Sequence, residues 1–199
     1  MSNVLLILSS PVPAEQSISY KLSETFISKY KKLNPKDNVK ILNLNDLPMA
    51  HKCIDAENFS SFFNEGDSEK YIEELKNIDK IVISAPMINF NVSSLLKNFL
   101  DHVLVANKTF SYKYSKKGDA IGLLTHLKVQ ILATQGAPYG WYLWGNHVKY
   151  LEGTFKFVGA EVVESLLIDG VKLEDKIKLT PQQVVDLYED KINELVKSF

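Results

Sequence analysis

The sequence predicts an α/β protein in which a five-stranded parallel sheet lies between two layers of helices. Five short apolar segments recur along the 199 residues, and stretches with helical spacing of apolar side chains separate them. The run at 81–85 is β-branched and does not alternate, which is typical of a strand buried on both faces of a parallel sheet. Right-handed crossovers place helices on both faces, so we expect a three-layer sandwich.

The predicted strands are the apolar segments at 4–8, 39–44, 80–85, 129–134 and 162–168. Lys40 and Asn43 dilute the second segment, which suits a strand near the sheet edge. Glu164 and Ser165 dilute the fifth segment in the same way, and we expect it at the other edge. Pro86 should end the pairing of the third strand, because a proline nitrogen has no hydrogen to donate.

Apolar side chains at helical spacing predict helices within 22–33, 71–75, 92–104, 147–158 and 184–199. Thr180, Pro181 and Gln183 predict the start of the last helix, with a capping hydroxyl, a proline in the first turn and a glutamine that reaches back. The segment 109–127 interrupts the alternation of strands and helices, and we interpret it as a hairpin-like excursion. No repeat, linker or low-complexity segment divides the chain, so we expect a single domain over 1–199.

Composition excludes several classes of protein. With 45% hydrophobic and 24% charged residues the chain can bury a large core, and its net charge of -1 gives no basic field for nucleic acid. No apolar run approaches the roughly 20 residues of a membrane span, and 4–8 lacks the flanks of a signal peptide, so we expect a cytoplasmic protein. Cys53 is the only cysteine, which excludes an internal disulfide, and we interpret it as an incidental loop thiol.

The loop after the first strand is rich in hydroxyl groups. Ser9 and Ser10 follow the strand, and Ser17 and Ser19 open the next helix. A helix start presents free N–H groups and the positive end of its dipole, so this loop is suited to hold a phosphate. The alternative is that Ser17 only caps the helix. The chain contains neither a nucleoside triphosphate loop nor a Gly-x-Gly-x-x-Gly dinucleotide motif. Hydroxyl and amide groups must therefore supply the hydrogen bonds that hold a phosphate.

The loop after the third strand is where open α/β sheets bind ligands. Asn89 offers donors and an acceptor to a ring edge, the backbone of Met87 and Ile88 can approach a planar group, and Phe90 can pack on it. The alternative is a plain strand-to-helix turn capped by Asn91 or Ser93. The loop after the fourth strand should close the opposite side of the site, and its residues are Thr134, Gln135 and Gly136, the last allowing close backbone approach.

These stretches together resemble the FMN-dependent NADH:quinone oxidoreductase and azoreductase family of flavodoxin-like fold. The resemblance rests on Ser9-Ser10, on Ser17-Ile18-Ser19, on 85–91 from Ala85-Pro86 to Asn91, and on Leu96-Lys97-Asn98. It implies that the serines and Ile18 hold the phosphate of FMN, that 86–90 lines the isoalloxazine ring, and that 134–136 completes the ring site. It also implies a homodimer with active sites at the interface.

Two positions depart from the family pattern. Ile88 stands where many relatives carry tyrosine, so a phenol hydroxyl is missing. The loop at 134–136, after the fourth strand, is the third loop of the predicted site. It contains no arginine, so the positive charge of such a side chain is missing from it. Both departures concern the choice of substrate and leave FMN binding as an expectation.

An aromatic segment follows the third loop. Tyr139, Trp141, Tyr142 and Trp144 are flat side chains that could stack on a quinone or an aryl azo compound, or bury a dimer contact. We expect Phe90, Tyr139, Trp141 and Trp144 to contact substrate. The four histidines show no spacing with carboxylates that indicates a metal site, and these are His51, His102, His126 and His147.

The sequence therefore predicts an enzyme in which NADH or NADPH reduces FMN and leaves, after which a quinone or azo compound takes two electrons at the same face. The order of events would give ping-pong kinetics. Asn89 is the candidate for tuning the flavin, which itself carries the chemistry. A non-catalytic flavin electron carrier that docks on proteins, and a flavin-free binding module, are the alternatives.

Overall fold

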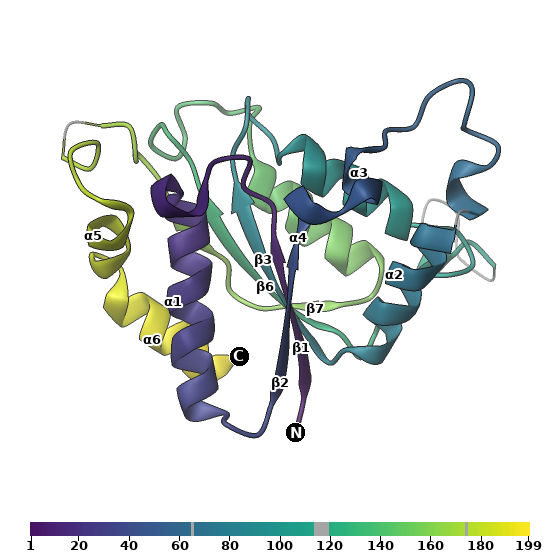
Figure 1. Ribbon diagram of the computed structural model, residues 1–199, viewed down its shortest axis with the longest axis horizontal. Helices are drawn as coiled ribbons and strands as arrows, with labels where there is room; N and C mark the ends of the chain where they lie inside the picture. The colour runs from purple at the N-terminus through teal and green to yellow at the C-terminus, as the bar shows by residue number, and fades with distance from the viewer. Residues whose placement is uncertain (65, 114–119, 174) are drawn as a thin grey trace.

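The computed structural model describes residues 1–64, 66–113, 120–173 and 175–199, and it shows a parallel sheet with helices on both faces (Figure 1). The strands lie in the order β2-β1-β3-β6-β7, with β8 also paired to β6, and all these pairs are parallel. Their bounds are Asn3–Leu8 (β1), Asn38–Asn43 (β2), Lys80–Pro86 (β3), Lys128–Thr134 (β6), Glu161–Val162 (β7) and Leu166–Ile168 (β8). The predicted α/β class and parallel sheet are confirmed.

Helices cover the two faces of the sheet as expected. One face carries α1 (Ile18–Leu33), α5 (Pro181–Asp186) and α6 (Glu189–Ser198), and the other carries α2 (Gly66–Asn77), α3 (Ser94–Val103) and α4 (His147–Phe157). Within the described ranges, four short 3-10 helices lie in the connections: η1 (Ala14–Gln16), η2 (Leu44–Asp46), η3 (Pro48–His51) and η4 (Phe62–Asn64). Among the residues that the structure describes, no helix is both long and apolar enough to cross a membrane.

Successive side chains of a strand point to opposite faces of the sheet, and the core is therefore divided into two clusters. Val4 and Leu6 of β1 pack toward α1 and α6, whereas Leu5 and Ile7 pack toward α2 and α3. Each of these four side chains is at most 2% exposed. Because the strands are parallel, the loops after β1, β3 and β6 meet at one edge of the sheet, where the predicted site residues lie.

Pro86 ends β3, as predicted. It is the last residue of the strand and lies opposite Thr134 of β6. The N–H of Met87 donates to the carbonyl of Thr134 at 2.8 Å, so the residue after the proline makes the last hydrogen bond between β3 and β6.

The fifth predicted strand is interrupted, and so is the last helix. β7 and β8 occupy the edge position expected for 162–168, and between them the side chain of Gln130 donates to the carbonyl of Glu164 at 2.9 Å in place of a backbone partner. The closing helix is two helices, because the chain makes a tighter turn at Tyr188, whose N–H donates to Val185 at 3.0 Å. The capping box of Thr180 and Gln183 is present as predicted.

The excursion after α3 is a short hairpin. β4 (Phe110–Ser111) pairs antiparallel with β5 (Ile121–Gly122), as expected, while 114–119 lie outside the described residues. Gly122 faces the backbone of Gly159, and a Cβ at Gly122 would lie 2.1 Å from its nitrogen. Only glycine allows this approach of the hairpin to the end of α4.

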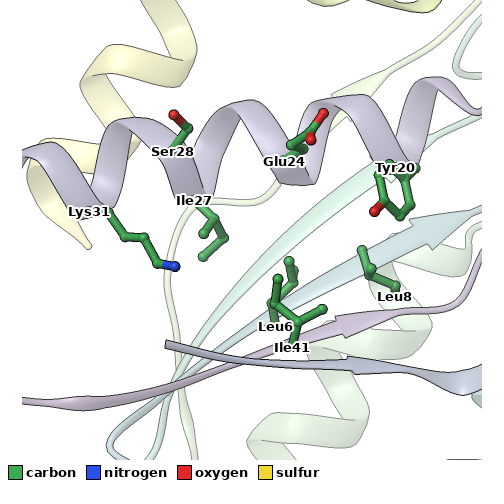
Figure 2. Close-up of a pocket in the computed structure, with 8 residues that line it drawn as sticks. All are labelled: Leu6, Leu8, Tyr20, Glu24, Ile27, Ser28, Lys31 and Ile41. Atoms are coloured by element: carbon green, nitrogen blue, oxygen red, sulfur yellow. The ribbon is translucent and has the colours of Figure 1, made fainter. Parts of the chain in front are cut away.

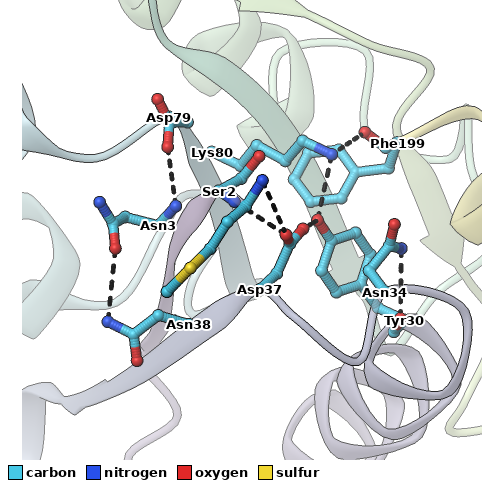
Figure 3. A network of polar contacts seen from close by, with 10 residues as sticks. Ser2, Asn3, Tyr30, Asn34, Asp37, Asn38, Asp79, Lys80 and Phe199 are labelled. Atoms are coloured by element: carbon cyan, nitrogen blue, oxygen red, sulfur yellow. Dashed lines mark hydrogen bonds and ion pairs between the residues drawn. The ribbon is translucent and has the colours of Figure 1, made fainter.

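A polar network lies where the strands begin, at the end of the sheet opposite the strand-end loops (Figure 3). The hydroxyl of Tyr30 donates to Asp37 at 2.6 Å, and Lys80 donates to that hydroxyl at 3.1 Å and to the carbonyl of Phe199 at 2.5 Å. Burial and the neighbouring carboxylate of Asp37 raise the pKa of Tyr30 well above its usual range, so the phenol stays protonated. The network joins both ends of the chain to β3, far from the strand-end loops.

Candidate functional site

Buried serine hydroxyls gather where β1 leads into α1. Ser17 is the N-cap of α1, and its Oγ accepts a hydrogen bond from the N–H of Tyr20 at 3.2 Å. The same Oγ donates to Ser10 Oγ at 2.9 Å and lies 3.2 Å from Ser19 Oγ. The three side chains are at most 5% exposed. Ser17 therefore caps the helix, as the alternative hypothesis held, and it also belongs to a cluster of hydroxyls.

This cluster stands at the positive end of α1. The N–H groups of Ile18 and Ser19 are in the first turn, where no helical acceptor exists, and they can donate to an anion. No acidic side chain lies in this first turn. Hydroxyls and amides there can surround a phosphate without a cation.

Ser9 has a different set of contacts. Its Oγ donates to the carbonyl of Ser84 at 2.5 Å, and its own carbonyl accepts from Ser93 Oγ at 2.8 Å. The Ser9 side chain is fully buried. These bonds fix the end of β1 against β3 and against the start of α3, so Ser9 positions the loop through its contacts with the protein.

The loop after β3 is a tight two-residue turn. Ile88 and Asn91 exchange backbone hydrogen bonds of 2.8 and 3.2 Å, and the two residues between them have positive φ, 46° at Asn89 and 72° at Phe90. Asparagine tolerates this region, whereas the conformation costs a phenylalanine about 1 to 2 kcal/mol. Strain of this kind clusters at ligand clamps, and here the Phe90 side chain stays partly exposed beside Tyr142 and Trp144.

Helix capping at this loop does not involve Asn89. Ser93 is the N-cap of α3 and accepts from the N–H of Leu96 at 3.3 Å, and Asn91 Oδ1 accepts from the N–H of Val92 at 2.8 Å. Within the described part of the chain, no hydrogen bond holds the exposed amide of Asn89. That amide is free to meet a ligand.

The third loop is joined to the loop that follows β8. Gln135 donates from its backbone to Ile168 at 3.0 Å, and Val171 donates back to Gln135 at 3.2 Å. Lys172 donates from its backbone to Gly136 at 3.0 Å. Thr134 and Gln135 are 6% exposed, so this loop offers its backbone more than its side chains.

An open groove of about 300 Å³ lies between the second and third loops. It brings together the predicted residues Met87, Asn89, Phe90, Gly136 and Trp141, and its other lining residues are Ala137, Tyr142, Lys172 and Leu173. Tyr139 and Trp144 do not line it, and neither do the serines of the first loop.

Aromatic side chains form one wall of this groove. The rings of Phe90 and Tyr142 are 4.9 Å apart, and Trp144 lies 5.8 Å from Phe90 and 5.6 Å from Tyr142. Trp141 is 63% and Trp144 73% exposed. Gly145 makes room for Phe90, because a Cβ there would lie 3.0 Å from the phenylalanine Cβ.

The ring of His147 contacts the end of β3, where the second loop begins. This histidine begins α4, is 1% exposed, and its Nε2 lies 3.1 Å from the carbonyl of Ala85, next to Pro86. Burial lowers its pKa from 6.5 to about 4. The ring is thus neutral at pH 7, with Nε2 as the donor to the carbonyl.

Lys172 is the residue that sequence analysis missed. It lines the groove beside the third loop, which contains no arginine. It lies far along the chain from Gly136, in a polar loop with no motif, and only the pairing between the two loops brings it there. The sequence contains no signal for this pairing.

A second groove lies on the α1 face at the β2 edge (Figure 2). It measures about 350 Å³, and its lining comes from β1, β2 and α1: Leu6, Leu8, Tyr20, Glu24, Ile27, Ser28, Lys31 and Ile41. No predicted site residue lines it. In the described ranges no three His, Cys, Asp or Glu side chains lie together as metal ligands would.

The fold and the strand-end loops define a flavodoxin-like protein. The family model described as flavodoxin-like fold matches residues 2–192. An FMN-dependent NADH:quinone oxidoreductase of Malacoplasma penetrans is 50% identical over 199 residues, which is 100% of this chain and 94% of the relative. Another of that name, from Mycoplasma mobile, is 54% identical over 183 residues, which is 92% of this chain and 90% of the relative.

A solved structure has the same fold. The azoreductase from Bacillus anthracis str. Sterne has a TM-score of 0.83 at 24% sequence identity, with 100% of both chains covered. The chain belongs to the flavodoxin-like family that includes the FMN-dependent NADH:quinone oxidoreductases.

Proposed function

We propose that this chain is an FMN-dependent oxidoreductase that uses NADH or NADPH to reduce quinones and aromatic azo compounds. Relatives at 50% identity or more carry the name FMN-dependent NADH:quinone oxidoreductase. The observation that carries the proposal is the groove formed by the strained turn at Asn89 and Phe90, which opens at the same sheet edge as the buried hydroxyls of the first loop.

The donors at the first loop fit the phosphate of FMN. Ser10, Ser17 and Ser19 supply hydroxyls, and the N–H groups of Ile18 and Ser19 point along the α1 dipole. Burial of the hydroxyls strengthens each bond to a charged group, because water competes less for it. Ser9 holds this loop against β3.

The second and third loops fit a planar ring. The backbone of Met87 and Ile88 and the amide of Asn89 would border one edge, and Gly136 would allow the third loop to approach closely. Pro86, Thr134 and Gln135 fix these loops through the β3 and β6 pairing. When bound there, FMN supplies the transfer of a hydride from NADH or NADPH and of two electrons to an acceptor.

The aromatic wall would hold the acceptor and exclude water from the ring. Phe90 and Trp141 line the groove directly, and Tyr139 and Trp144 flank it. The nicotinamide and the acceptor would both stack on the part of the ring that faces this wall, so the nicotinamide must leave before the acceptor enters. We therefore expect ping-pong kinetics. The cytoplasmic location stays a prediction.

The test of the proposal is the identity of the cofactor. We expect one tightly bound FMN per chain, seen as a yellow protein whose extracted flavin has the mass of FMN. Anaerobic addition of NADH should bleach the visible absorbance, and menadione should restore it. FAD, or a protein that takes up no flavin on reconstitution, would contradict the proposal.

Replacing Asn89 by alanine should slow flavin reduction while FMN remains bound. The amide lies at the predicted ring edge, where charge develops during reduction. Stopped-flow reduction by NADH measures the rate, and we expect a loss of about tenfold.

The control is Asn89→Gly, since alanine at a φ of 46° adds backbone strain that glycine does not. Both variants should be slow if the amide acts on the ring. A normal rate in Asn89→Gly would assign the residue to the turn alone.

We also propose a homodimer whose two sites are each completed by the partner chain. Trp141, Leu143 and Trp144 are between 63% and 90% exposed, and such apolar clusters mark a pocket or a partner surface. Replacing Trp141 and Trp144 by alanine should reduce menadione turnover at least about fivefold, since stacking on an aromatic ring contributes about 1 kcal/mol. Reduction by NADH should change less.

Sedimentation of both proteins at assay concentration accompanies the kinetics. A fully active wild-type monomer would exclude the shared-site arrangement. Unchanged menadione kinetics in the double variant would assign the two tryptophans to packing.

A further inference from the structure

The loop after β8 is held against the third loop along its length. The carbonyl of Ala137 accepts from the N–H of Gly170 at 3.0 Å, and Asp169 Oδ2 accepts from the N–H of Tyr139 at 2.6 Å. The Lys172 N–H donates to Gly136 at 3.0 Å. The backbone of Lys172 is thus fixed at the mouth of the groove.

The side chain of Lys172 is also positioned. Its Cδ, Cγ and Cε would lie 3.0, 3.2 and 3.4 Å from a Cβ built on Gly136, so the aliphatic stem lies across the glycine. This contact directs the stem along the third loop and leaves the ammonium beyond it. In the described chain no carboxylate pairs with that ammonium.

The charge of the groove comes from this lysine. Lys172 is the one charged residue among the described residues that line the groove, and the others are apolar, aromatic or amide side chains and backbone. Two described carboxylates lie three residues from Lys172 along the chain: Asp169 is engaged by the Tyr139 N–H, and Asp175 forms no ion pair with Lys172 among the described residues. An aromatic wall with one unpaired cation at its end is complementary to a flat molecule that carries an acidic group.

We propose that Lys172 selects aromatic acceptors that bear a sulfonate or carboxylate, by pairing with that group while the ring stacks on Phe90 and Trp141. This inference rests on the proposed function and names the substrate class of the same groove. Lys172 is a specificity-determining residue here, because it contacts the acceptor outside the reducible part. The lysine ammonium is a point charge without the planar, two-pronged geometry of an arginine guanidinium, so it can pair with acidic groups of different shape.

The experiment compares Lys172→Gln with wild type on two acceptors, menadione and 1,4-naphthoquinone-2-sulfonate. An ion pair with an exposed lysine changes affinity by up to about fivefold, so the variant should lose about three- to fivefold in kcat/KM for the sulfonate. It should change less than about twofold for menadione. Lys172→Arg, which keeps the charge, should retain most of the wild-type preference.

A binding measurement gives a readout that does not depend on turnover. Of the two tryptophans of the chain, Trp141 lines the groove and Trp144 packs on Phe90, so their fluorescence reports on its occupation. We expect naphthalene-2-sulfonate, which is not reduced, to quench them with a Kd that rises about three- to fivefold in Lys172→Gln. Added salt should weaken binding to wild type more than binding to the variant.

The matched control is Lys178→Gln, which removes an exposed lysine of the same connection and the same unit of charge but does not line the groove. It should leave both acceptors and the quenching unchanged. Equal Kd values in wild type and Lys172→Gln would overturn the inference, as would a change confined to the KM of NADH. If no quinone is reduced by any of the proteins, the proposed function fails, while the fluorescence titration still decides the role of Lys172.

Discussion

Replacing Ser17 and Ser19 together by alanine should weaken FMN binding at least tenfold. Each hydroxyl is buried and stands at the N-terminus of α1, where a hydrogen bond to a charged phosphate contributes about 1.5 to 3 kcal/mol. Loss of both removes two donors from the first turn of α1, where the cation of Lys21 is paired with Glu24. Titration of the apoprotein with FMN, followed by quenching of flavin fluorescence, measures the affinity.

The capping role of Ser17 requires its own control. Loss of the cap costs about 1 kcal/mol of stability, and this alone would lower the melting temperature without touching the ligand. Ser19→Ala removes a hydroxyl that caps no helix. Thr180→Ala removes the N-cap of α5, which is far along the chain from the serine loop. We expect Ser19→Ala to weaken FMN binding and Thr180→Ala to lower stability only. Unchanged affinity in the double variant would leave the serines as structural residues.

The sheet was predictable because its strands are local patterns. The run at 81–85 and the run at 4–8 are apolar without interruption, and only a buried strand suits such segments at that length. The ends of elements depend on contacts that are distant in sequence. The last hydrogen bond between β3 and β6 is made by Met87, which donates to Thr134, and the closing helix breaks at Tyr188, whose hydroxyl accepts from Lys176 at 2.9 Å.

Some residues of the candidate site were predictable from local patterns, and others are placed by contacts distant in sequence. Ser17 and Asn89 lie beside strands and helices whose patterns mark them, so their place at the sheet edge follows from the order of the elements. The positive φ of Phe90 has no such signal, because the sequence around it does not contain the glycine that usually adopts it. Lys172 enters the groove through tertiary hydrogen bonds between two loops, which no local pattern encodes.

Stability should fall steeply as the pH drops from 6.5 to 4, because His147 is buried and neutral. Its pKa is about 4 in the folded protein and 6.5 as a free side chain, so the unfolded chain binds a proton in this window and the folded chain does not. The stabilisation that it provides is complete above pH 6.5 and is lost as the pH falls through the folded pKa. The loss is about 3 kcal/mol by pH 4.

Urea denaturation at several pH values between 7 and 4 tests this expectation. His147→Gln keeps a donor for the carbonyl of Ala85 but does not titrate, so its free energy of unfolding should fall by about 3 kcal/mol less than that of wild type over the same range. His51→Gln, at an exposed histidine, controls for removal of a histidine as such. Parallel curves for wild type and His147→Gln would show that His147 does not set the acid limit. Because His147 holds the end of β3 where the turn at Asn89 begins, acid should loosen the ring site together with the fold, and FMN release should follow the same pH curve as unfolding.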